Sequence, residues 1–166
     1  MTSNIQLQKY VTTHPQRFPN QHFLGVFAAN QLPKIVARNC SLIVNYSTSN
    51  EAGTHWCAMN HLNANQPVEF FGSYGLTPDQ VYPILHFERE GFEKYMNANS
   101  NGLGVKYNSV DLQSWRVGEN ECGEWALLFL MNGLPNIHNP VWAKFLGITD
   151  KIKRDIAVKQ YIGIRK

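Results

Sequence analysis

The chain has 166 residues, of which 43% are hydrophobic and 16% are charged, which is typical of one globular domain and argues against a disordered chain. Its formal net charge of +3 allows contact with a polyanion without requiring it. We expect neither a membrane span nor secretion, because no apolar run is long enough to span a bilayer and the N-terminus lacks a signal-peptide pattern.

The three cysteines are Cys40, Cys57 and Cys122, an odd number without a CxxC pair. This pattern argues against a disulfide framework and against a zinc ribbon, and it favours a reducing compartment. We therefore expect no metal site.

The first half of the chain contains four runs that are typical of β-strands, after a polar stretch (1–21) that is irregular or a short helix. The predicted strands are 23–27, 41–46, 54–60 and 68–71, and the last two should form a hairpin because a turn at 63–67 separates them.

Helical signals dominate the second half of the chain. Thr77 is a good N-cap, Pro78 fits the first helical position, and Gln80 completes a capping box, while Pro83 should kink or restart the helix. Helical pattern resumes as far as about residue 97, a strand is predicted over 105–110, and further helices are predicted from residues 122 and 141, with a basic helix or strand at the C-terminus. We expect a single α+β domain (1–166) in which helices flank a central, mostly antiparallel sheet.

Cys122 stands where a polar loop meets an apolar helix. A sulfur at a helix N-terminus is close to the positive end of the helix dipole and to free backbone N–H groups, which favour the thiolate. Cys122 is therefore a candidate nucleophile. The alternative is a small buried cysteine that packs the start of the helix.

His55 is the best placed of the six histidines to act as a base for such a thiol. It should open the strand that contains Trp56, and a bulky aromatic neighbour can limit the motion of the imidazole and the access of water. The alternative is a purely structural histidine. Cys57 is a rival nucleophile that is better explained as a core residue, and Cys40 is likewise expected to be structural.

Three motifs in order, GTHW (53–56), FFGSYG (70–75) and NECGEW (120–125), resemble the adenovirus-type cysteine proteases, which are relatives of the SUMO-specific proteases. The similar region runs from about residue 23 to residue 130, and includes the segments 23–33 and 41–56. The resemblance implies that Cys122 is the nucleophile, that His55 is the general base, and that Trp56 packs near the histidine. It also implies that Gln113 helps to form the oxyanion hole and that Gly123 leaves room for the substrate.

Two departures from the family pattern affect the site. The usual acidic partner of the histidine is replaced by Gly72; Glu69, which should point to the opposite face of its strand, and Asp79 are the substitutes considered. Gln113 lies nine positions before the nucleophile, a longer gap than usual, so that Trp115, Arg116 or a backbone amide are alternatives for its role. A working Cys–His dyad, a weakened enzyme and an inactive variant all stay open.

The resemblance implies a viral cysteine endopeptidase that processes capsid or other virion precursors at Gly-containing sites, in the virion and the host cytoplasm or virus factory. Some members of the family use a cysteine-linked peptide activator or DNA as cofactors, but residues 98–110 contain no cysteine for a disulfide-linked activator, and we expect no cofactor. The basic residues of the C-terminal segment, Lys151, Lys153, Arg154 and Lys159 among them, leave weak DNA contact open. The alternatives are a protease that deconjugates ubiquitin-like proteins and a catalytically impaired binding module that retains the protease fold.

Overall fold

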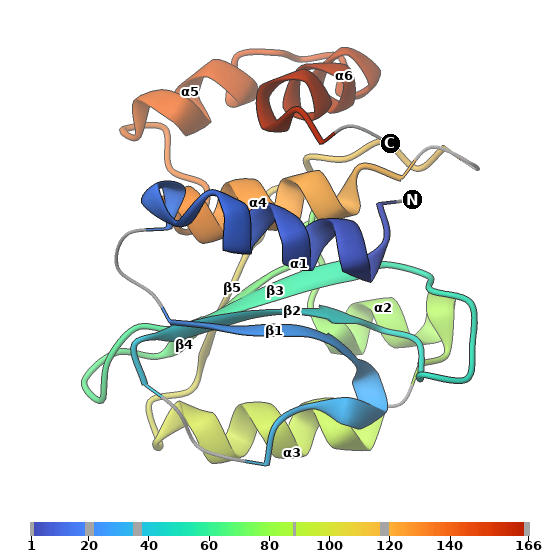
Figure 1. Ribbon diagram of the computed structural model, residues 1–166, viewed down its shortest axis with the longest axis vertical. Coiled ribbons are helices and arrows are strands. Elements are labelled where there is room, and N and C mark those ends of the chain that lie inside the picture. The colour runs from blue at the N-terminus through green and yellow to red at the C-terminus, as the bar shows by residue number, and fades with distance from the viewer. Residues whose placement is uncertain (1, 19–21, 35–37, 88, 117–119, 165–166) are drawn as a thin grey trace.

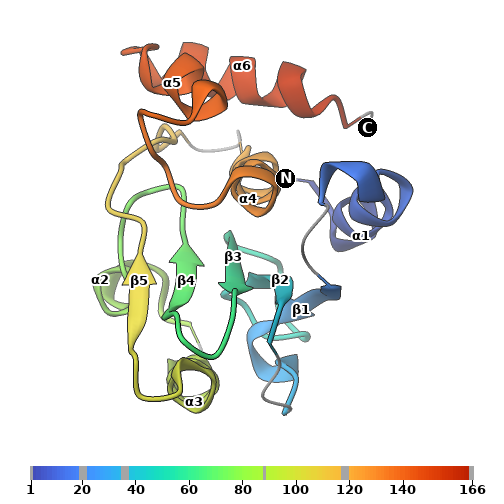
Figure 2. The ribbon, with the colours of Figure 1, turned by 90° about the vertical axis from the view of Figure 1, so that its left-hand side faces the viewer.

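A computed structural model describes residues 2–18, 22–34, 38–87, 89–116 and 120–164. Five strands form one sheet in sequential order: β1 (His22–Ala28), β2 (Cys40–Asn45), β3 (Trp56–His61), β4 (Val68–Phe71) and β5 (Val105–Tyr107). Helices α1 (Asn4–Thr13) and α4 (Cys122–Asn132) cover one face, and α2 (Pro78–Leu85) and α3 (Arg89–Ser100) cover the other (Figures 1 and 2). Two further helices, α5 (Pro140–Leu146) and α6 (Lys151–Ile162), lie above α4. The predicted α+β class is confirmed.

The sheet is more mixed than predicted. The central pairs β2–β3 and β3–β4 are antiparallel, as expected for the predicted hairpin, but β1 runs parallel to β2 and β5 runs parallel to β4. Both outer strands arrive through long connections, and such connections permit parallel pairing. Strand β5 ends at Tyr107, not at the predicted residue 110, because Asn108 turns to donate from Nδ2 to the Gly72 carbonyl at 2.7 Å.

The predicted helix start at Thr77 is confirmed. The Thr77 side chain accepts from the Gln80 backbone N–H, and the Gln80 side chain accepts from the Thr77 N–H. The helix continues through Pro83 to Leu85, and His86 closes it in the left-handed conformation. Ser3 and Gln6 form a second capping box, so that the polar N-terminal stretch contains a true helix, α1.

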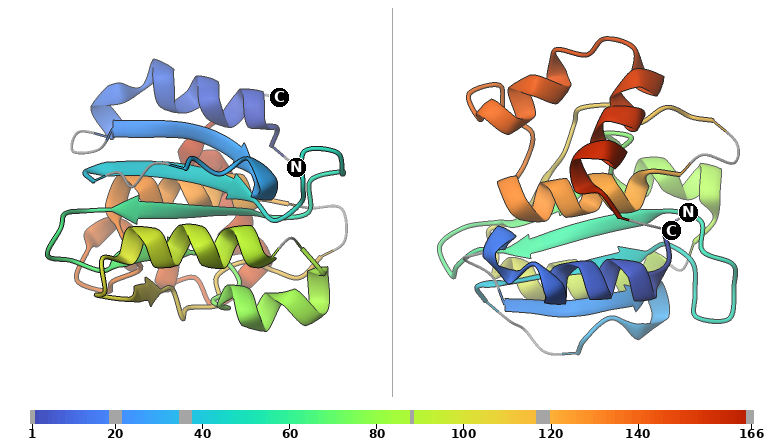
Figure 3. Two further views of the ribbon diagram at one scale, coloured as in Figure 1. Left: turned by 90° about the horizontal axis from the view of Figure 1, so that it is seen from below. Right: turned by 45° about the horizontal axis from the view of Figure 1, so that its top comes forward.

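The core lies on both faces of the sheet. On one face Ile43, Ala58 and Phe71 pack against α1 and α4, and on the other face Val44 and Phe70 pack against α2 and α3. Figure 3 shows the helices on the two sides of the sheet. Residues 122–130 of α4 are all buried, so that this apolar helix is enclosed nearly all round. None of the described helices is both long and apolar enough to cross a membrane.

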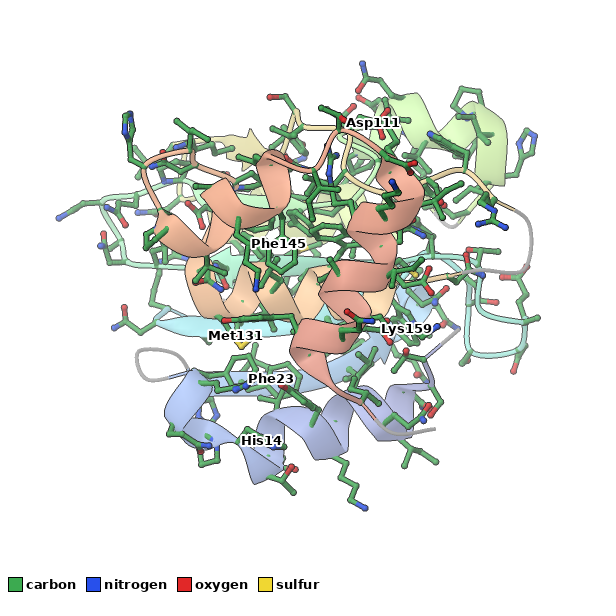
Figure 4. All side chains as sticks on the ribbon, turned by 90° about the horizontal axis from the view of Figure 1, so that it is seen from above. His14, Phe23, Asp111, Met131, Phe145 and Lys159 are labelled. Carbon is green, nitrogen blue, oxygen red and sulfur yellow. The ribbon has the colours of Figure 1, made fainter. Side chains whose placement is uncertain are left out.

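The basic C-terminal segment, predicted as a helix or strand, is helix α6, and its basic residues are only partly exposed to solvent. Arg154 is 8% exposed and donates to the carbonyls of Ile148 and Leu112. The bond to Leu112 holds the residue that precedes Gln113 against α6. Lys159 Nζ lies 3.1 Å from Oε1 of Glu121, the residue that precedes α4. Figure 4 looks down on this layer, in which Lys159 of α6 and Phe145 of α5 are labelled.

Asp155 of α6 joins three elements. Its buried carboxylate accepts from Ser114 N at 3.0 Å, from Ser114 Oγ at 2.7 Å and from Trp125 Nε1 at 2.9 Å.

We expect Asp155→Ala to lower the free energy of unfolding by about 3 kcal/mol, because three buried donors lose their acceptor. Urea unfolding measures this value. Asp79→Ala removes only an exposed pair with Arg89 and should cost less than about 1 kcal/mol; equal losses in the two variants would contradict the role of Asp155.

Candidate active site

Cys122 is the first residue of α4 and is completely buried. Its Sγ accepts a hydrogen bond from the backbone N–H of Trp56 at 3.4 Å. That N–H belongs to the peptide bond between His55 and Trp56. Trp56 and Cys122 are 66 positions apart in the sequence. Folding therefore brings the sulfur to the backbone of the His55–Trp56 pair within the GTHW motif.

His55 lies one residue before β3, rather than opening the strand as predicted, and 2% of its surface is exposed. Its carbonyl accepts from the N–H of Tyr46, which follows β2, so that the end of one strand fixes the start of the next. Neither ring nitrogen has a hydrogen-bond partner among the residues that the structure describes. Both nitrogens are buried, and they could accept a partner only once the site opens.

Aromatic rings enclose the imidazole on both sides. The Tyr74 ring stacks on His55 at a centroid distance of 4.5 Å, and Tyr46 lies nearly parallel on the opposite side at 5.9 Å. Trp115 stacks in turn on Tyr74 at 3.8 Å and is 49% exposed. We call Tyr74 and Trp115 the aromatic cover, because they lie between the imidazole and solvent.

Burial sets the protonation of this closed arrangement. It lowers the pKa of His55 to about 3 and raises the pKa of Cys122 to about 12. The N–H groups of Trp56 and Gly123 oppose the shift of the thiol pKa, whereas the Glu124 carboxylate adds to it. At neutral pH the pair is therefore a thiol and a neutral imidazole.

Gln113 is fully buried, and the Ser73 hydroxyl donates to its Oε1 at 2.6 Å. The Gln113 backbone N–H also donates to the Ser73 carbonyl, so this glutamine is held to the turn that carries Tyr74. Its Nε2 has no partner among the described residues. A buried, unpaired amide donor is the group that an oxyanion hole requires. The alternative donor Trp115 instead belongs to the aromatic cover.

The position of the missing acid has room for a side chain. A Cβ on Gly72 would lie 3.7 Å from the Leu76 carbonyl and 3.8 Å from Cys57 Sγ, which are ordinary contacts. The two carboxylates considered as substitutes have other neighbours: Glu69 accepts from Asn60 at 3.4 Å, and Asp79 pairs with Arg89 on the surface. Stacked rings, and not a carboxylate, surround His55.

The other two cysteines are also buried, as predicted for structural residues. Cys57 lies in the core cluster of the α2 and α3 face, and burial raises the pKa of its thiol strongly. Cys40 begins β2 and pairs across the sheet with His61 of β3. No group of three or more metal-binding side chains occurs within the described ranges.

Sequence reasoning missed Tyr46, Tyr74 and Asp155. Tyr46 ends the predicted strand 41–46, and Tyr74 lies within FFGSYG (70–75). The positions of these residues in the sequence do not show that their rings face His55. Asp155 lies among the basic residues of the C-terminal segment and belongs to none of the three motifs. A lone carboxylate beside apolar positions of that helix was the only available signal.

The buried histidines should make the fold sensitive to acid. Burial lowers the pKa of His55 to about 3 and that of His61 to about 4, whereas both titrate near 6.5 when unfolded. The unfolded chain therefore binds more protons below about pH 6.5, and stability falls as pH falls through this range. We expect a loss of about 2 kcal/mol for each histidine between pH 6.5 and 5.

Urea unfolding at pH 7 and pH 5 measures this dependence. The His55→Phe variant should lose about half of it, whereas the same change at the exposed His138 should leave it intact. An unchanged pH dependence in His55→Phe would show that the imidazole is not sealed from protons.

No family model matches the chain, and no curated protein matches it. Among solved structures, the Se-Met form of the ASFV pS273R protease superposes with a TM-score of 0.55 at 13% sequence identity, over 99% of this chain and 67% of that one. The chain has the fold of that protease. A second crystal structure of the ASFV protease matches with a TM-score of 0.49 at 14% identity, over 100% of this chain and 67% of that one.

Proposed function

We propose that this chain is a cysteine endopeptidase in which Cys122 is the nucleophile and His55 is the general base. The observation that carries the proposal is the contact of Cys122 Sγ with the peptide N–H that joins His55 to Trp56. A helix start and a strand start thereby bring the Cys122 sulfur to the backbone of the His55–Trp56 pair, within a fold shared with a protease.

The proposed reaction begins when the Cys122 thiol passes its proton to His55 and the sulfur attacks the scissile carbonyl. The tetrahedral intermediate collapses as His55 returns the proton to the leaving amine, which leaves a thioester on Cys122. Water then attacks the thioester with His55 again as base, and the acid product departs while the thiol is restored. Gln113 Nε2, an unpaired buried donor, would stabilise the oxyanion in both halves.

The closed arrangement must open before this reaction. The neutral thiol and imidazole result mainly from burial, and displacement of the aromatic cover would admit substrate and water. Solvation of the site then favours the charged thiolate and imidazolium, since desolvation is the main cause that opposes them. Stacking between Tyr46 and Tyr74 would orient the imidazole, which is the task of the acid in related enzymes.

We further propose that the substrates are capsid or other virion precursor proteins cleaved at Gly-containing sites, in the virion and the host cytoplasm or virus factory. Similarity to a viral protease and the three sequence motifs support this substrate class. Direct DNA contact has weaker support, because Lys159 and Arg154 of the basic segment already bind groups within the chain.

The test compares three kinds of substrate: a fluorogenic peptide ending in Gly-Gly, a capsid precursor, and ubiquitin or SUMO fused to a fluorophore. Cleavage of the peptide and precursor supports the endopeptidase, and turnover of the fusion proteins alone favours deconjugation. The closed site and Gly72 favour one other candidate, a binding module without activity. Iodoacetamide that fails to label Cys122 in the presence of every substrate would support that candidate and contradict the protease.

A further inference from the structure

A polar groove of about 530 Å³ adjoins the candidate active site. Its walls come from the start of α1, the end of β1 and the loop 47–53, and Trp56 forms part of its lining. Figure 1 shows the N-terminal end of α1 and the teal loop between β2 and β3 at the same end of the molecule. Trp56 follows His55 in the chain and its backbone N–H contacts Cys122 Sγ, so the groove lies beside the candidate active site.

Asn45 provides an unused hydrogen-bond donor in this groove. The side chain lines the groove but is only 4% exposed, and its Oδ1 accepts from the N–H groups of Ser47 and Thr54, each at 3.0 Å. These two bonds fix the orientation of the amide, so the remaining atom is the NH₂ donor. Nδ2 has no partner within the described part of the chain. A buried donor without a partner is unfavourable, and a ligand carbonyl would satisfy it.

The charge of the groove indicates which ligands fit. Glu51 is the one charged side chain among the described residues of the lining, and hydrogen bonds from Thr48 lower the pKa of its carboxyl. The other lining groups are hydroxyls, amides and apolar surfaces. Such a groove suits an extended peptide backbone with small or basic side chains and repels acidic ones.

We propose that this groove binds the substrate peptide beside the scissile bond, that Asn45 Nδ2 donates to a backbone carbonyl of the peptide, and that Glu51 faces a basic side chain. The inference rests on the proposed protease function and specifies its substrate class. Asn45 thereby holds the peptide backbone, while Glu51 selects among side chains.

Asn45→Asp tests the donor, because the change keeps the Oδ1 acceptor and removes the NH₂ group. With acetyl-Ala-Lys-Gly-Gly-aminocoumarin as substrate, we expect KM to rise about tenfold while kcat stays within about twofold. The rate of Cys122 alkylation by iodoacetamide in mild denaturant, without peptide, should also stay within about twofold. Asn65→Asp in the exposed β3–β4 loop adds the same charge far from the groove and should match the parent.

A binding measurement separates this inference from the proposed function. Fluorescence anisotropy with the labelled tetrapeptide acetyl-Ala-Lys-Gly-Gly and the Cys122→Ala variant reports binding without turnover. Binding that Asn45→Asp weakens supports the groove even if the parent cleaves no peptide, in which case only the protease proposal fails. Absence of binding, or equal affinity with and without Asn45→Asp, overturns the inference and leaves any observed cleavage standing.

A second binding experiment tests whether Glu51 selects a basic side chain. The parent should bind the Lys peptide more tightly than the same peptide with Glu in place of Lys, and Glu51→Gln should abolish this preference. Equal preference in the parent and in Glu51→Gln would remove Glu51 from the proposal.

Discussion

Replacement of Cys122 by alanine should lower kcat/KM for peptide cleavage by at least about 10³-fold, since the Cys122 sulfur forms the thioester in the proposed reaction. Iodoacetamide should label the parent at this residue once substrate or mild denaturant opens the site, and should leave the variant unlabelled there. Fluorogenic turnover and mass spectrometry of tryptic peptides measure the two effects.

Cys57 provides the matched control for this experiment. It is as deeply buried as Cys122, lies two residues after His55, and packs on the opposite face of the sheet. Cys57→Ala should retain turnover and lose about 1 kcal/mol of stability through a small cavity. If turnover instead persisted in Cys122→Ala and vanished in Cys57→Ala, the nucleophile would have been misassigned.

Replacement of His55 by phenylalanine should lower kcat/KM by about 10²- to 10⁴-fold, the usual contribution of a general base. Phenylalanine keeps a ring between Tyr46 and Tyr74 and removes only the nitrogens. Because those nitrogens are buried without partners, the variant should be at least as stable as the parent at pH 7. Kinetics paired with thermal unfolding therefore separate a catalytic loss from a folding defect.

The pH profile of the same variant adds a second readout. Turnover by the parent should fall on the acidic side as the base becomes protonated in the open enzyme, and the residual activity of His55→Phe should lack that limb. His138→Phe, at an exposed histidine, should behave as the parent does. Retention of the acidic limb in His55→Phe would assign the base to another residue.

Local signals in the sequence were sufficient to predict most elements. β-rich apolar runs located β1 to β4 to within about two residues, and the Thr77 capping box located the start of α2, because both depend on neighbouring residues. The parallel outer strands were not predicted, since pairing between distant segments leaves no local pattern. Burial of Arg154 was missed for the same reason: its acceptor carbonyls lie in other segments of the chain.

The sequence predicted only part of the candidate site. Motif order predicts that Cys122 and His55 act together; the structure shows Cys122 Sγ at the Trp56 N–H, and no hydrogen bond from the described residues to either His55 ring nitrogen. The motif could not reveal that Tyr74 lies across the imidazole, that Trp115 lies across Tyr74, or that Asn45 carries an unpaired donor. Those features depend on ring orientation and on which partners are already taken, and neither property is encoded in spacing.

The sealed sulfur has a consequence for the durability of the protein. Peroxide oxidises accessible thiolates, and the higher oxidation states of cysteine are irreversible. In the closed arrangement the Cys122 thiol is protonated and buried from solvent. The protein should therefore resist oxidation when no substrate is bound. In the proposed reaction Cys122 becomes vulnerable only while a bound peptide keeps the site open, which would limit oxidative damage to that period.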